Sequence, residues 1–212
     1  MNQSTSETWE DAAEEAISAL FDRAVISGLE EPDQLIRYMR LKIGSTLKTD
    51  ENREYDYSHM SKMASQAGFW QFLASHSLRL LNSTGTRFTA QNMLDILTMK
   101  QKDYGPKNIS EFGIIGLLIR VNDKIARLEN MTQKTDSFNT AININAVPQE
   151  SLNDTLVDII GYSAIATMWL TKDQLGNRKF LLPMRSMRTM RPMQPTPQMR
   201  PMQTAGTTWN NA

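Results

Sequence analysis

A stripe of apolar residues near the middle of the chain constrains its fold most strongly. Ile114, Leu118, Val121, Ile125 and Leu128 follow one another at spacings of four, three, four and three residues. This spacing puts their side chains on one face of an α-helix. The segment is therefore predicted to be an amphipathic helix that buries this face.

Three similar stripes precede it in the N-terminal half. A helix is predicted from Trp9 to about Ala24, behind an acidic first turn, and Gly28 lies where it would end. Pro32 fits the first position of a second helix, which Gly44 would close. A single third helix is predicted over residues 60–81, after a polar connector.

Two more helices complete an all-α prediction. Thr89 can cap a helix that runs to about Asp103, and Pro148 can open a final helix whose half after Asp158 is apolar almost all round. Residues 132–147 are compatible with either a loop or a small strand pair. No strand ladder is evident elsewhere, so a helical bundle is the expected fold.

Composition and charge limit the classes of protein to which the chain can belong. The 212 residues contain no cysteine, which excludes disulfides and thiolate chemistry and suits a cytoplasmic setting. The acidic N-terminus lacks the features of a signal peptide, and no stretch is long and apolar enough to span a membrane. The formal net charge is zero, although the acids gather before residue 55.

Composition also divides the chain. The expected parts are an N-terminal helical region (1–85), a helical module (86–175) and a tail (183–212), with the loop at 82–86 as internal boundary. The tail holds six methionines and four arginines but no acid. Such a tail is predicted to be disordered, and the alternative is contact with nucleic acid or with an apolar groove of a protein partner.

Two helices carry charged faces. Arg120, Lys124 and Arg127 lie at i, i+4 and i+7 with Asp123 beside them, so the cations form one patch that suits phosphate. A solvated face with an Asp123–Arg127 pair explains the same spacing.

An acidic face lies on the final helix, where Glu150, Asp154 and Asp158 recur every four residues. Their oxygens suit Mg²⁺, although Glu150 is a weak candidate because it also fits as a first-turn acid. Asp158 lies at the entry to the buried half and needs a partner, either a metal ion or a basic residue such as Arg120 or Lys124.

The turn between the fourth and fifth predicted helices is rich in polar groups. It can stack a base and hold phosphates, or it can simply end a helix at Gly105-Pro106. Its candidate residues are Lys102, Asp103, Tyr104, Lys107 and Asn108. His59 and His76 have no clustered companions, so a histidine metal centre is not expected. No nucleophile elbow and no glycine-rich phosphate loop is found.

Three ordered motifs together resemble a known family. They are residues 102–105 (KDYG), 116–128 (GLLIRVNDKIARL) and 150–162 (ESLNDTLVDIIGY). They are similar to the nucleotide modification associated domain family of bacteriophages and bacteria, over roughly residues 92–170. That family is similar to the MazG-like all-α nucleoside triphosphate pyrophosphohydrolases. The resemblance implies Mg²⁺-dependent cleavage of a nucleotide to its monophosphate and pyrophosphate.

The resemblance also implies roles for single residues. Asp154 and Asp158 match the outer acids of the metal-binding E-E-L-x-D motif, and Asp123 alone represents the other metal helix. Asp123 and Asp158 would then be catalytic. Phosphate charge would be neutralised by five cations: Lys102, Lys107, Arg120, Lys124 and Arg127.

Two other classes of function remain open at this point. One is a nucleotide-binding or DNA-modification accessory protein without hydrolysis, and the other is a helical scaffold that binds nucleic acid or a partner through its tail. The long apolar faces of the N-terminal helices suit a homo-oligomer, as is common in MazG-like relatives. If the chain is encoded by a phage, the expected location is the host cytoplasm.

Overall fold

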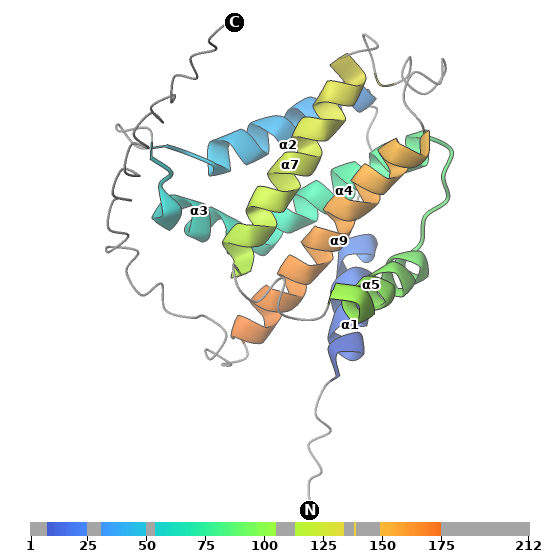
Figure 1. Ribbon diagram of the computed structural model, residues 1–212. Coiled ribbons are helices and arrows are strands. Elements are labelled where there is room, and N and C mark those ends of the chain that lie inside the picture. Colours follow the sequence, from blue (N-terminus) through green and yellow to red (C-terminus); the bar gives the residue numbers. More distant parts are fainter. Residues whose placement is uncertain are drawn as a thin grey trace, which may run out of the picture. The chain divides into compact units, whose positions relative to one another are not determined.

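Helices make up almost all of the chain that the structure describes (Figure 1). This computed structural model describes residues 8–24, 31–49, 54–104, 113–133, 138 and 149–174. The helices are α1 (Trp9–Asp22), α2 (Pro32–Thr46), α3 (Tyr57–Ala64), α4 (Ala67–Ser83), α5 (Ala90–Tyr104), α7 (Gly113–Gln133) and α9 (Gln149–Gln174). Within these ranges the only β-type pairing is one antiparallel bridge between Thr49 and Tyr55. The all-α prediction is confirmed.

Local hydrogen bonds explain where the helices begin. The Thr8 hydroxyl accepts from the Asp11 N–H at 3.1 Å, and the Asp11 carboxylate accepts from the Thr8 N–H at 2.9 Å. Thr89 and Asn92 make the same reciprocal pair before α5, at 3.2 and 3.0 Å, which confirms the predicted cap. Pro32 is the first residue of α2, as predicted.

The single helix predicted over residues 60–81 is wrong, because the chain forms two helices there. α3 ends at Ala64, and Gln66 has an extended backbone (φ −87°, ψ 117°) before α4 begins. The Trp70 indole N–H donates to the Ala64 carbonyl at 2.6 Å. This bond satisfies a carbonyl at the end of α3 and buries the indole. Ala67, which the single helix would have buried, is exposed at the start of α4.

α9 is the centre of the packing. It contacts α4 most extensively, then α7 and α1, and it also contacts α5, which lies beside it and against α1 (Figure 1). As predicted, its half after Asp158 is buried on nearly all sides, including Ile159, Ile160 and Ala164. Ser163 is also buried, and its hydroxyl donates to the Ile159 carbonyl at 2.8 Å.

The expected boundary at residues 82–86 joins helices of one packing unit. α1 and α4, which precede the loop, both pack on α9, which follows it. Residues 182–212, which include the predicted tail, lie outside the described residues. Of the segment 132–147, the residues beyond Gln133 also lie outside, except Phe138, whose N–H donates to Asp33 at 2.9 Å.

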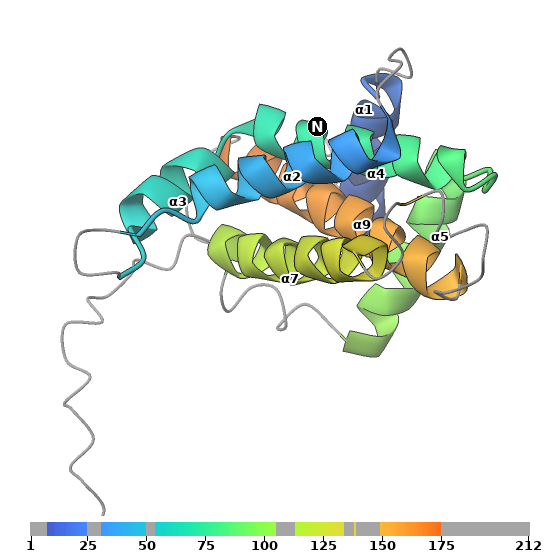
Figure 2. The same ribbon diagram turned by 90° about the horizontal axis from the view of Figure 1, so that it is seen from above.

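α7 runs beside α2, with α3 at one end of the pair and α5 beyond the other (Figure 2). Among the described helices, α2 packs against α7, α4 and α3. None of the described helices combines the length and the apolar character needed to cross a bilayer.

Candidate functional site

α7 carries two different sets of polar residues on the flanks of its buried stripe. The cations Arg120, Lys124 and Arg127 each precede a buried residue of the stripe by one position, whereas Asn122 and Glu129 each follow one. Because successive residues are about 100° apart around a helix, the two sets lie on opposite flanks. One flank faces α9 and the other faces α2.

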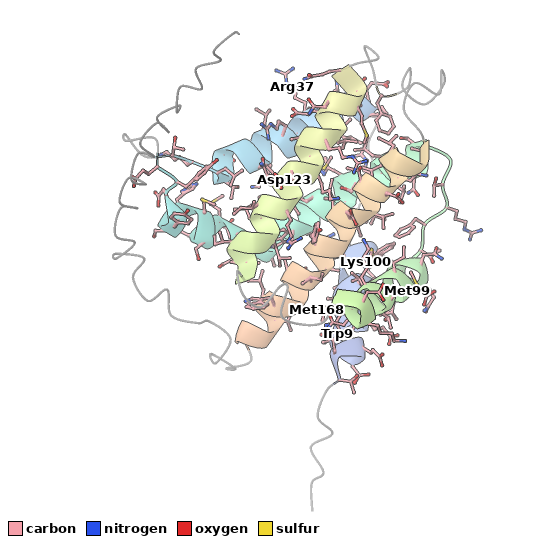
Figure 3. The ribbon with its side chains drawn as sticks, in the orientation of Figure 1. Trp9, Arg37, Met99, Lys100, Asp123 and Met168 are labelled. Atoms are coloured by element: carbon pink, nitrogen blue, oxygen red, sulfur yellow. The ribbon has the colours of Figure 1, made fainter. Side chains whose placement is uncertain are left out.

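On the α9 flank, three helices bring charged side chains together. Lys124 Nζ of α7 lies 2.7 Å from Asp158 Oδ2 of α9, and Lys100 Nζ of α5 lies 2.5 Å from the other oxygen, Oδ1. Asp158 is only 18% exposed, while Lys124 is about a quarter and Lys100 about half exposed. Lys100 lies where α5 approaches α9 (Figure 3). We call these three residues the α5–α7–α9 junction.

A glycine allows α5 to come this close. A Cβ on Gly161 of α9 would lie 3.2 Å from Met93 Cε and 3.4 Å from Leu97 Cδ2, both on α5. Asp158 is one turn before Gly161, and Lys100 is one turn after Leu97. The close approach of the two helices therefore sets Lys100 over the Asp158 carboxylate.

Opposing effects act on the pKa of Asp158. Desolvation by burial is the largest single effect and raises the pKa, whereas hydrogen bonds and charge from Lys100 and Lys124 lower it. The cations prevail, and the pKa lies below the ordinary value of 3.8. The carboxylate is therefore ionised at neutral pH, and the partner predicted for Asp158 includes Lys124.

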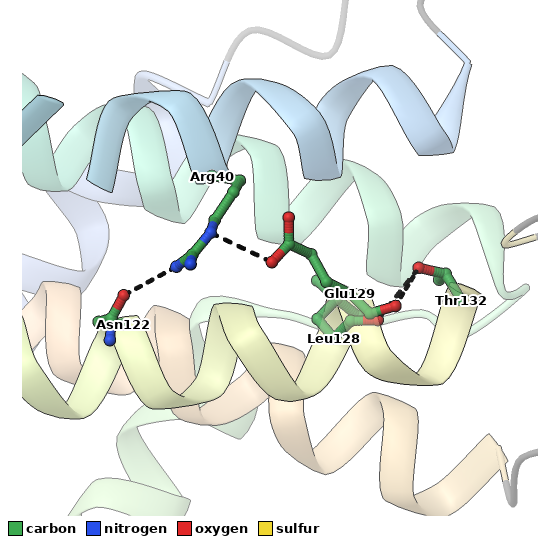
Figure 4. Close-up of polar contacts among 5 residues, drawn as sticks. All are labelled: Arg40, Asn122, Leu128, Glu129 and Thr132. Atoms are coloured by element: carbon green, nitrogen blue, oxygen red, sulfur yellow. Dashed lines mark hydrogen bonds and ion pairs between the residues drawn. The ribbon is translucent and has the colours of Figure 1, made fainter. Parts of the chain in front are cut away.

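On the α2 flank, Arg40 makes a separate set of contacts. Its Nη1 donates to Asn122 Oδ1 at 2.9 Å, and its Nε lies 3.2 Å from Glu129 Oε2 (Figure 4). We call this group the Arg40 clamp. One cation faces one carboxylate and one neutral amide here, so charge is balanced and the group joins α2 to α7.

Four other predicted residues of the charged faces lie on α7 and α9, within about one turn of Lys124 or Asp158. Asp154 is exposed one turn before Asp158, and Asp123 is exposed beside Lys124 (Figure 3). Arg120 is half-buried and Arg127 exposed. Among the described residues, no three acids or histidines gather closely enough to hold a metal ion.

The candidates from the predicted turn are dispersed. Lys102 lies about 200° around α5 from Lys100. It lines a groove of about 520 Å³ between α1 and α5, whose other charged residues are Glu10, Asp11, Glu14 and Asp95. Asp103 is exposed in the last turn of α5. The side chains of Tyr104 and Glu150, and all of Lys107 and Asn108, lie outside the described residues.

Sequence reasoning missed Lys100, although a signal was present. Met93, Leu97 and Lys100 are spaced by four and three residues, so the lysine continues the stripe that α5 buries against its neighbours. A half-exposed lysine that extends such a stripe is well placed to meet an anion on the facing helix. It therefore pointed to a carboxylate on the facing helix.

Comparison with protein-family models, with curated proteins and with solved structures finds no match to this chain. The junction is therefore interpreted from its own geometry.

Proposed function

We propose that this protein processes nucleotides and that the junction binds their phosphates. The observation that carries the proposal is the convergence of Lys100 and Lys124, from two helices, on one partly buried carboxylate. The charges of the three groups sum to +1, so the two ammonium groups are only partly neutralised. A polyphosphate offers several oxygens and more negative charge than Asp158 does, and it would compete for both lysines.

The reaction that we propose is hydrolysis of a nucleoside triphosphate to its monophosphate and pyrophosphate. Asp123, Asp154 and Asp158 are the residues that would hold Mg²⁺, which when bound supplies charge neutralisation and an activated water. As arranged here, Asp158 does not fit a magnesium site, because each of its oxygens is engaged by a lysine. Binding without hydrolysis is the second candidate, and this engagement of Asp158 favours it.

A binding and turnover experiment tests the phosphate site. The full-length protein is titrated with canonical and modified deoxynucleoside triphosphates, with and without Mg²⁺, and pyrophosphate release is measured in parallel. Lys124→Ala should weaken nucleotide binding about tenfold, because a charge-assisted hydrogen bond contributes roughly 1.5 kcal/mol.

Arg40→Ala is the matched control, because it removes a cation that also pairs with an acid on a neighbouring helix. It should leave nucleotide affinity unchanged. Pyrophosphate release would support hydrolysis, and binding without release would support the second candidate. If no nucleotide bound, or if both variants bound as the unmodified protein does, the phosphate site would be wrong.

A further inference from the structure

A second surface, on α2 and the start of α3, has no role in the proposed nucleotide chemistry. Large apolar side chains are exposed at six positions of the described residues, and four of them lie between residues 38 and 57. These are Tyr38 (43% exposed), Leu41 (60%), Tyr55 (53%) and Tyr57 (49%). Such a concentration of exposed rings in one region is typical of a binding surface.

Cations lie between these side chains. α2 and the residues up to Thr49 carry no acid after Asp33, whereas Arg37, Arg40, Lys42 and Lys48 all lie in this stretch. Arg40 points toward α7 and belongs to the clamp. Arg37 projects away from the helices (Figure 3), and Lys48 is exposed. Among the described residues, no acid forms an ion pair with Arg37, Lys42 or Lys48.

The helix period aligns the outer residues. Arg37 and Leu41 are four residues apart, so they share the face of α2 opposite its buried residues, and Lys48 follows just beyond the end of the helix at Thr46. Tyr38 flanks this face, and its ring meets the His76 ring of α4 edge-on at 6.4 Å.

The end of α2 is fixed to the segment that carries the other two tyrosines. The Asp56 N–H donates to the Lys48 carbonyl at 3.0 Å, and Thr49 pairs with Tyr55. His59 Nε2 lies 3.0 Å from the Ser45 carbonyl oxygen. The segment between α2 and α3 contains four acids, Asp50, Glu51, Glu54 and Asp56, and the Asp56 carboxylate accepts the His59 N–H to cap α3. The cations therefore line α2, and rings lie beside it and at its end.

We propose that this surface, formed by Arg37, Tyr38, Leu41, Lys42, Lys48 and Tyr55, binds single-stranded nucleic acid. Exposed rings stack unpaired bases, and cations between them follow the phosphate backbone. A single strand suits the surface better than a duplex, because its bases are free to stack. A second copy of the chain suits it less well, since a two-fold contact would place the like-charged surfaces of the two copies together.

Fluorescence anisotropy with a labelled oligothymidine of about 20 nucleotides tests the proposal on the full-length protein. Tyr38→Ser should weaken binding about tenfold through lost stacking. Arg37→Gln with Lys48→Gln should reduce the slope of log affinity against log salt by about 1.4, at roughly 0.7 for each phosphate contact. Equal thermal unfolding curves would show that the variants remain folded.

The matched control is Arg23→Gln with Arg87→Gln, which removes two exposed charges from other helices and loops. It should change neither the affinity nor the salt slope. Binding that survives the α2 variants but falls when Arg185, Arg188, Arg191 and Arg200 become Gln would assign it to the tail and overturn the proposal. The proposal would also be overturned if the protein bound no oligonucleotide, or if it self-associated and Leu41→Ser abolished that self-association.

Discussion

The two flanks of α7 make the same kind of contact with different charge balance. In the Arg40 clamp, one cation faces one carboxylate and one amide. In the α5–α7–α9 junction, two cations share one carboxylate that is less exposed than Glu129. A balanced pair is complete without a ligand, whereas an unbalanced group retains affinity for a further anion. Charge balance, rather than the number of charges, distinguishes the functional candidate from the structural contact.

The largest expected effect comes from a packing change that disturbs the α9 flank of α7 and leaves the α2 flank intact. Gly161→Leu should force α5 away from α9, because the added side chain meets Met93 and Leu97. Overpacking of this kind costs roughly 2 kcal/mol of unfolding free energy, and nucleotide binding should fall because Lys100 leaves the junction. Urea unfolding and nucleotide titration measure both effects.

Gly44→Leu is the control for this substitution. Gly44 is also within a helix, but a Cβ there meets nothing within 4 Å. Replacing this glycine should stabilise α2 by about 0.7 kcal/mol through helix propensity. Equal unfolding free energies for the two variants would mean that the close approach at Gly161 does not hold α5 in place.

An intermediate effect comes from neutralising the acid of each flank. Asp158→Asn and Glu129→Gln should each lower the unfolding free energy by about 1 kcal/mol, because both remove one partner of a partly exposed ion pair. Their effects on ligand affinity should differ. Asp158→Asn frees two lysines and should raise nucleotide affinity about threefold, measured by titration without Mg²⁺.

Glu129→Gln should leave that affinity unchanged. If Asp158→Asn weakened nucleotide binding instead, the carboxylate would be part of the binding site rather than a competitor for the lysines.

The smallest expected effect is a pH dependence confined to the junction. The folded protein lowers the pKa of Asp158 below 3.8, since the two lysines outweigh desolvation. The folded state therefore binds this proton more weakly than the unfolded state, and the stabilisation is present above pH 3.8 and is lost as pH falls through the lowered pKa.

The unmodified protein should accordingly lose its stability advantage over Asp158→Asn as the pH falls below 3.8 through the lowered pKa of Asp158. Urea unfolding of both proteins at several pH values measures the difference. An advantage that stayed constant over this range would show that the ion pairs contribute no stability.

The helices and their buried faces could be predicted from the sequence, because periodicity reports which residues share a face. The start of α2 at Pro32 and the cap of α5 at Thr89 could also be predicted, because each depends on a local capping bond or backbone constraint. The break at Gln66 could not be predicted, because the apolar residues before and after it recur at helical spacing in the sequence. Period alone cannot distinguish one long helix from two aligned ones.

The junction could be predicted only in part. Spacing singled out Lys124 and Asp158 and required a partner for the carboxylate. It did not show which helix would face α9, and so Lys100 was missed while Lys102, two positions later, was chosen. The facing helix was set by Gly161, whose role depends on packing between segments far apart in the sequence.

The position of α7 between its two partners has a mechanical consequence. The helix is joined to α2 by the ion pair with Arg40 and to α9 by the ion pair of Lys124. A ligand that draws Lys124 from Asp158 breaks the ion pair between α7 and α9 but leaves the one between α7 and α2. α7 therefore stays attached to the helix that carries Arg37 and Tyr38. If occupancy at one end changes affinity at the other, thermodynamic linkage requires the reverse influence to be equal in size.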